Sequence, residues 1–173
     1  MTAVSGQDLR CRRWWVGILT LLILGTSCAS SGPAIKIQPA ESSLQVNDTV
    51  QVPVLVENIA DLSAFEAHLS FDTSVLEVTE LKDGGFVTAD FIVQSVFDNA
   101  AGTIDYAVAQ INRPPANGDG ILFEVVFRAK TPGQSTIHFR EIFAAPAGVI
   151  LVDPDGIAIQ VLLTEANVTV RGH

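Results

Sequence analysis

Acid–base chemistry in this chain would have to come from three histidines and nineteen carboxylates. The histidines, His68, His138 and His173, do not fall in a spacing that indicates a Ser/His/Asp triad. A pair of carboxylates can hydrolyse a glycosidic bond, and acidic residues are plentiful. Sugar-cleaving sites usually add aromatic platforms, however, and beyond residue 28 the chain has no Trp and only one Tyr, Tyr106. We therefore predict that this protein is not an enzyme.

Thiol and metal chemistry are equally poorly supported by the residue types. Both cysteines, Cys11 and Cys28, lie near the N-terminus, so the rest of the chain can form no disulfide, zinc cluster or thiol nucleophile. The segment Asp153–Gly156 (DPDG) resembles the start of a calcium loop, but the remaining ligands and the terminal Glu are missing. We interpret it as a turn and expect no metal or cofactor on this chain.

Residues 1–28 predict an export signal. Arg10, Arg12 and Arg13 are followed by an apolar run, Trp14–Leu24, that is too short to span a bilayer. The run ends in LGTSC, which resembles a lipoprotein processing site with Cys28 as the lipidated residue. The alternative is ordinary secretory cleavage near Ala29 or Ser31. We expect an extracellular protein, held on the outer face of the cell membrane by several acyl chains on Cys28, since one chain binds only weakly.

The charge balance narrows the possible partners. The chain carries a formal net charge of −9, and residues 1–28 contribute +2 of it, so the remainder carries −11. Such a surface repels phosphates, which argues against nucleic acid and against direct binding to anionic lipid. After a short tether at 29–34, residues 35–171 are long enough to form one domain around a hydrophobic core.

Alternation of apolar and polar residues predicts strands along this whole domain. The pattern is clearest from Asp48 to Val78, and Gly102 closes a predicted hairpin loop in a left-handed conformation. The segment Asn112–Gly120 has the composition of a loop. The expected strands are 35–38, 43–46, 50–58, 63–71, 75–81, 91–97, 103–110, 121–129, 135–142, 149–152 and 157–170. Short strands at this spacing indicate an all-β sandwich or jelly roll.

The same period assigns two faces to the strands at 63–71 and 103–110. Alternate residues point inward on each strand: Phe65, Ala67, Leu69 and Phe71 on the first, Ile104, Tyr106 and Val108 on the second. The outward positions are then Ala64, Glu66, His68, Ser70, Asp105, Ala107 and Ala109, with Gln110 and Asn112 in the loop that follows. On the pattern alone, these outward residues favour an ordinary solvated face over a binding surface.

Three motifs, in this order, are similar to those of the cohesin domain family. They are VQVPV at 50–54, LSFDTSVLEV at 69–78, and GDGILFEVVFRAK at 118–130 followed by a Pro-Gly turn. The resemblance implies a nine-stranded jelly-roll sandwich without catalytic activity. It also implies a flat sheet face that binds dockerin modules, whose calcium is carried by the dockerin. The partner-binding residues that it suggests here are Ala64, Glu66, His68, Ser70, Asp105, Ala107, Ala109, Gln110 and Asn112.

Two other functions are compatible with a sandwich of this kind. Many carbohydrate-binding modules are jelly rolls, so direct binding of a polysaccharide is one alternative, although the scarcity of Trp and Tyr argues against it. A structural or adhesive surface domain without a dockerin partner is the other. The resemblance favours a dockerin-bearing protein as the partner, plausibly a polysaccharide-degrading enzyme.

Overall fold

The computed structural model describes residues 32–172, and within that range the chain forms strands, turns and loops without a helix. The helix search accordingly finds no membrane-spanning helix in the described residues. The strands are β1 (Ala34–Ile37), β2 (Glu41–Gln45), β3 (Thr49–Leu62), β4 (Ala64–Ser70), β5 (Leu76–Asp83), β6 (Phe91–Asp98), β7 (Thr103–Ala109), β8 (Ala116–Ala129), β9 (Gly133–Phe139), β10 (Val149–Val152), β11 (Leu162–Thr164) and β12 (Ala166–Arg171).

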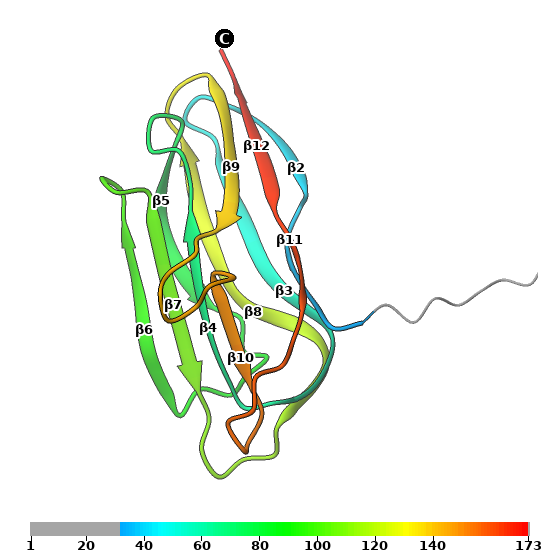
Figure 1. Ribbon diagram of the computed structural model, residues 1–173. Coiled ribbons are helices and arrows are strands. Elements are labelled where there is room, and N and C mark those ends of the chain that lie inside the picture. Colours follow the sequence, from blue (N-terminus) through cyan, green and yellow to red (C-terminus); the bar gives the residue numbers. More distant parts are fainter. Residues whose placement is uncertain (1–31, 173) are drawn as a thin grey trace, which may run out of the picture. The chain divides into compact units, whose positions relative to one another are not determined.

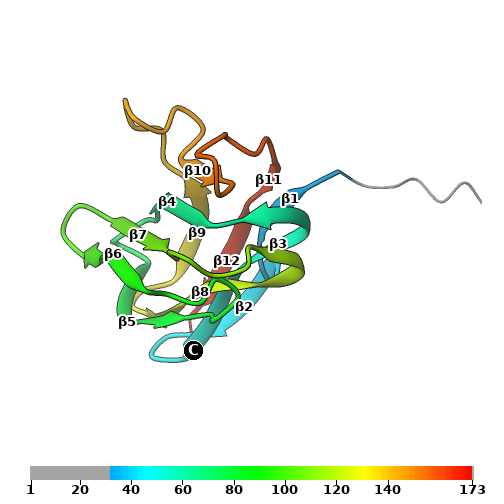
Figure 2. The ribbon, with the colours of Figure 1, turned by 90° about the horizontal axis from the view of Figure 1, so that it is seen from below.

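The strands form two sheets that pack face to face as a sandwich (Figure 1). One sheet has the order β11-β1-β3-β8-β5, and the other has the order β2-β12-β9-β4-β7-β6, with β10 also paired to β4. Seen along the strands, β5, β8 and β3 lie in one layer and β6, β7 and β4 in the other (Figure 2). The predicted all-β sandwich is therefore confirmed, and the described residues contain twelve strands, compared with eleven expected from the pattern and nine implied by the resemblance.

The core lies between the two layers and follows the predicted alternation. Phe65, Leu69, Ile104 and Tyr106 are all at most 3% exposed. Tyr106 of β7 stacks on Phe123 of the opposite sheet with ring centroids 4.6 Å apart. The buried core residues all lie between Ile35 and Val170, so residues 32–172 enclose a hydrophobic core of their own, as a domain does.

One predicted loop is in fact strand. Residues 116–120, expected to lie in the loop 112–120, form the first part of β8; two of the three register shifts in the β3–β8 pairing lie in this part. Polar side chains satisfy the backbone where the ladder is interrupted, because Asp119 and Asn117 accept hydrogen bonds from backbone amides of β3. The sequence pattern missed this extension because bulged pairing breaks the period of two.

The predicted strand 157–170 is divided between the two sheets. Its first part, β11, pairs in parallel with β1, whereas β12 pairs with β9 and β2 in the other sheet. The β6–β7 hairpin, in contrast, has the predicted form, since Gly102 closes its loop at φ 71°. The chain thus places β4 and β7 side by side in one sheet, with β6 as the edge strand next to β7.

Candidate functional site on the outer face of the β4–β7 sheet

The predicted outward residues of β4 and β7 come together because the two strands pair in register. Ala64 lies opposite Ala109, Glu66 opposite Ala107, His68 opposite Asp105 and Ser70 opposite Thr103. In an antiparallel ladder such directly opposed residues point to the same face of the sheet. We call this outer surface of β4 and β7, with the neighbouring parts of β6 and β10, the docking face.

The half of the docking face around Ala64 and Ala109 is an apolar trough. Its floor is made of small side chains, Ala64, Ala107 and Ala109, and larger ones border it, Val93 on β6 and Ile150 and Val152 on β10. The two bordering strands are three strand spacings apart, or roughly 14 Å. An α-helix with its side chains is about 10–12 Å wide. The trough therefore has the width to accept a helix laid along the strands.

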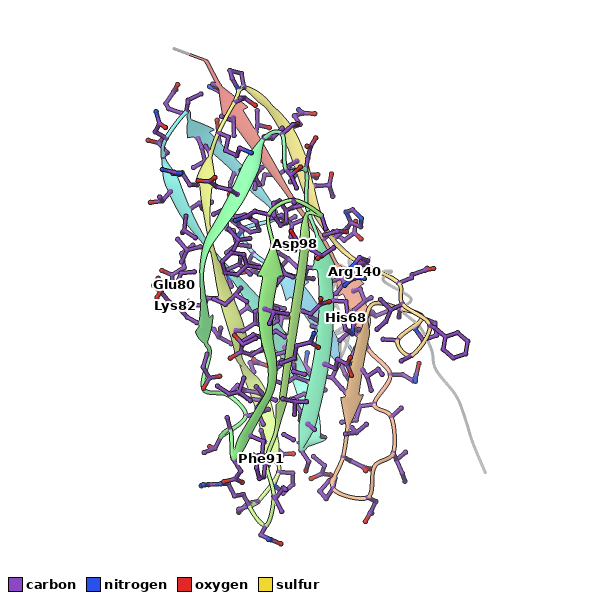
Figure 3. All side chains as sticks on the ribbon, turned by 90° about the vertical axis from the view of Figure 1, so that its left-hand side faces the viewer. His68, Glu80, Lys82, Phe91, Asp98 and Arg140 are labelled. Carbon is purple, nitrogen blue, oxygen red and sulfur yellow. The ribbon has the colours of Figure 1, made fainter. Side chains whose placement is uncertain are left out.

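The other half of the docking face carries a charged cluster around His68. Its Nε2 lies 2.7 Å from Glu66 Oε1, and its Nδ1 lies 2.6 Å from Asp105 Oδ1. Arg140, which follows β9, also pairs with Asp105. Ionised carboxylates only accept hydrogen bonds, so both contacts of His68 are hydrogen bonds together only when both ring nitrogens carry protons. In that form the cluster holds two anions and two cations. Figure 3 shows His68 and Arg140 next to each other beside the centre of the sheet.

The His68 side chain is more deeply buried in this face than the sequence suggested. Its side chain is only 5% exposed, compared with 36% for Glu66 and 20% for Asp105. A partner would therefore contact the two carboxylates more readily than the ring that joins them. The alternation correctly placed His68 on the outer side of β4, but it carries no information on how far neighbouring side chains cover a residue.

Arg140 is the member of the cluster that the sequence reasoning did not identify. It was included in a predicted strand, 135–142, whereas β9 ends at Phe139. Its Nε is buried and has no hydrogen-bond partner among the described residues. The available signal was a basic residue in a strongly acidic chain, close in sequence to a strand of the same sheet.

The two loop residues predicted for the site have different surroundings. Gln110 is only 9% exposed, and its side-chain amide donates a hydrogen bond of 2.9 Å to the carbonyl of Pro114, so it braces the loop. Asn112 is exposed, with φ at 57°. Both line a hollow with Ala64, Val152 and Asp153 at the end of the trough. At the opposite end of the docking face, beyond the charged cluster, Ser70 Oγ lies 2.8 Å from His138 Nε2.

The search for metal sites finds no cluster of three or more His, Cys, Asp or Glu side chains suited to an ion in residues 32–172. The turn at Asp153–Gly156 has the role expected from the sequence, since Asp153 Oδ1 accepts bonds from the backbone amides of Asp155 and Ile157. These contacts stabilise a tight turn through the carboxylate itself. Cys28 and the rest of the predicted export signal lie outside the described residues.

A β-sandwich with an apolar trough and a charged cluster on one sheet face has the features of a protein-docking module. Comparison with protein families gives the same class, because the cohesin domain model matches residues 33–150. The chain belongs to the cohesin domain family. The resemblance seen in the three sequence motifs is thereby confirmed.

Individual relatives are distant in sequence and close in fold. The chain is 22% identical over 138 residues to cell surface glycoprotein 1 of Acetivibrio thermocellus and 27% identical over 107 residues to cellulose-binding protein A of Clostridium cellulovorans. These matches cover 67% and 61% of this chain but only 6% of each relative. A type I cohesin–dockerin complex from Clostridium thermocellum contains a chain with a TM-score of 0.68 at 20% identity, covering 82% of this chain and all of that one.

Proposed function

We propose that this protein is a non-catalytic module that binds a dockerin-bearing protein through the docking face. The observation that carries the proposal is the apolar trough, because a row of alanines between larger side chains makes a concave surface of helical width. The small residues Ala107 and Ala109 are in this view the floor that admits the helix.

The charged cluster would supply specificity next to the trough. Glu66 and Asp105 are the exposed acceptors there, so donor groups on a bound helix, such as Ser, Thr, Lys or Arg side chains, would complement them. The calcium of such a complex would be held by the dockerin. Ser70, Gln110 and Asn112 would contact the partner at the two ends of the helix.

The proposal extends to the location of the protein. The expected export signal and Cys28 support an extracellular module on the outer face of the cell membrane, where it would hold a secreted polysaccharide-degrading protein. Direct sugar binding has less support, because Tyr106 is 1% exposed and packed against Phe123, so it offers no platform to a sugar ring.

Filling the trough tests this function. Ala109→Leu places a larger side chain on the floor without entering the core, and we expect it to weaken binding at least about 100-fold, as a steric block in the centre of an interface does. Ala100→Leu, in the exposed turn after β6, is the matched control and should bind like the unchanged protein. The probe is a library of calcium-loaded dockerin modules screened on an array, followed by calorimetry on those that bind.

The outcomes separate the candidate functions. Loss of binding in Ala109→Leu but not in Ala100→Leu, together with dependence on calcium, supports the proposal. Equal affinity of the two variants removes the trough from the binding surface. Retardation of the unchanged protein by soluble glucans, with no dockerin bound, would favour a carbohydrate-binding module instead.

A further inference from the structure

The outer edges of the two sheets are not protected equally. In the described part of the chain the edge strands are β11 and β5 in one sheet and β2 and β6 in the other. β11 has three residues, β2 is largely polar, and β5 carries a bulge and several charges, including Glu80 and Lys82. Short, charged or bulged edges are the usual ways in which proteins prevent unwanted strand pairing.

β6 has much less protection than these strands. It runs for eight residues, FIVQSVFD, and its only charge is Asp98 at the end. A register shift near Val93 leaves Gln94–Asp98 regularly paired with β7 on one side and unpaired on the other. Figure 3 looks onto this edge of the sandwich, with Phe91 at one end of β6 and Asp98 at the other.

Both faces of β6 are apolar and exposed. Phe91 and Val96 lie beside outward residues of β7, whereas Ile92 and Phe97 lie beside the inward Val108 and Ile104. The exposed fractions are 58% for Phe91, 54% for Ile92, 70% for Val93, 50% for Val96 and 40% for Phe97. With about 150–250 Å² for a large side chain, the five together expose on the order of 500 Å². A patch of this size is typical of an interaction site.

We propose that β6 is a self-association edge, at which two copies of this chain pair antiparallel and form one continuous sheet. The unpaired backbone of Gln94–Asp98 would supply the hydrogen bonds, and the five apolar side chains of each copy would supply the buried surface. The interface would be isologous, since the same strand contributes to both sides of a two-fold axis at Val96, the centre of Gln94–Asp98.

A second copy fits this edge because β6 carries a single charge, and that charge favours the antiparallel orientation. An antiparallel pair centred on Val96 separates the two Asp98 carboxylates by about four residues of strand, or roughly 13 Å, which exceeds the Debye length of about 8 Å at physiological salt. Each Asp98 would lie opposite Gln94 of the other copy. A parallel pair would place the two Asp98 carboxylates next to each other.

The expected dimer is weak and sensitive to salt. Two patches of this size bury on the order of 1,000 Å² of apolar surface, at the lower end of the range for specific interfaces. Each chain is strongly acidic, so general repulsion opposes association, and added salt should strengthen the dimer by screening it. The trough floor on β4 and β7 remains open in this arrangement, and Val93 would border both the trough and the dimer interface. The two docking faces of a dimer would lie on one continuous surface.

The first test measures association of residues 31–173, which contain the whole core. Sedimentation equilibrium from low micromolar to near-millimolar concentration should show a monomer–dimer equilibrium that shifts to dimer with salt. Val96→Lys places a charge on the exposed edge and should leave only monomer. Ile157→Lys is the matched control, because Ile157 is 64% exposed in a turn that belongs to no strand of this edge. It should dimerise like the unchanged protein.

The second test reads the orientation through engineered cysteines, since residues 31–173 have none of their own. Val96→Cys lies at the proposed two-fold axis and should form a disulfide-linked dimer under mild oxidation. Asp98→Cys should not, because its thiols would be about 13 Å apart in the antiparallel pair. A chain that stays monomeric at the highest concentration, a Val96→Lys variant that dimerises normally, or efficient linkage through Asp98→Cys would each overturn the proposal.

Discussion

Replacing His68 with leucine tests whether the charged cluster stabilises the fold. Leucine fills a similar volume but cannot bond to Glu66 or Asp105, so both contacts of 2.7 and 2.6 Å are lost. A hydrogen bond to a charged group contributes about 1.5–3 kcal/mol. Because both carboxylates are partly exposed and regain water, we take a value near the lower end for each bond. The expected loss in the free energy of unfolding is about 1.5 kcal/mol for a ring that donates one bond and about 3 kcal/mol for a ring that donates both.

This loss is large enough to measure in two ways. Unfolding entropy is about 2.1 cal/mol/K per residue, so a domain of this size should melt roughly 10 °C lower for a 3 kcal/mol loss. Urea unfolding at neutral pH should show the same change as a lower midpoint with an unchanged slope. His138→Leu is the matched control, because His138 is exposed and bonds only to Ser70 at the surface, and its loss should stay below about 1 kcal/mol.

A small effect at His68 would refute the reasoning. If His68→Leu costs no more than His138→Leu, the two carboxylates are as well accommodated by water as by the ring. The cluster would then be a surface feature with no part in stability. A large effect in both variants would instead indicate that histidines on this sheet act through general packing.

Two further predictions concern the core and a turn. Burial, followed by the neighbouring Asp83, raises the pKa of Tyr106 to about 12. Folding favours the neutral phenol, so stability present below pH ~10, the ordinary ionisation point, is lost as pH rises toward 12. Phenolate absorbance of the single tyrosine in residues 31–173 and urea midpoints at alkaline pH should follow this, with less alkaline loss in Tyr106→Phe; a native titration near the ordinary value would contradict it. Gly102→Ala should cost at least about 2 kcal/mol, because φ is +71° and the new Cβ would lie 2.5 Å from the carbonyl oxygen of Phe71. Gly85→Ala, with a similar φ and open space around it, should cost only about 1 kcal/mol in urea unfolding, and equal costs would remove the clash as the cause.

The central sheet could be predicted because it depends on local pattern. Phe65, Leu69, Ile104 and Tyr106 alternate with polar or small residues, and each is buried as expected. The hairpin between β6 and β7 followed from turn chemistry at Gly102. Such features need only the period of two and the conformational freedom of glycine, both of which are visible in a short stretch of sequence.

The shape of the candidate site could not be predicted in the same way. The alanines of β4 and β7 make a trough only because Val93 and Ile150 project on either side, and those residues come from strands far apart in the chain. The depth of His68 depends on Glu66 and Asp105 in the same way. These properties follow from which strands become neighbours, and the period of a single strand does not contain that information.

The junction between β9 and β10 has a consequence for how the trough responds to a guest. At His68 the neighbour along one edge of β4 changes from β9 to β10. The backbone carbonyl of His68 accepts a hydrogen bond from the amide of Arg140, which follows β9, and its amide donates to the carbonyl of Gly148, which precedes β10. One wall of the trough is β10, which pairs with β4 through four residues. Leu151 is its most deeply buried side chain and anchors the strand to the core. The opposite wall stands on the much longer β6.

Short ladders open at lower free energy than the strands of the core. The amides of β10 should therefore exchange with solvent before those of β4 and β7, while the charged cluster and β9 stay in place. The wall on β10 should then adjust more readily than the trough floor on β4 and β7. A single rigid sandwich could in this way accommodate helices that differ in the bulk of their side chains.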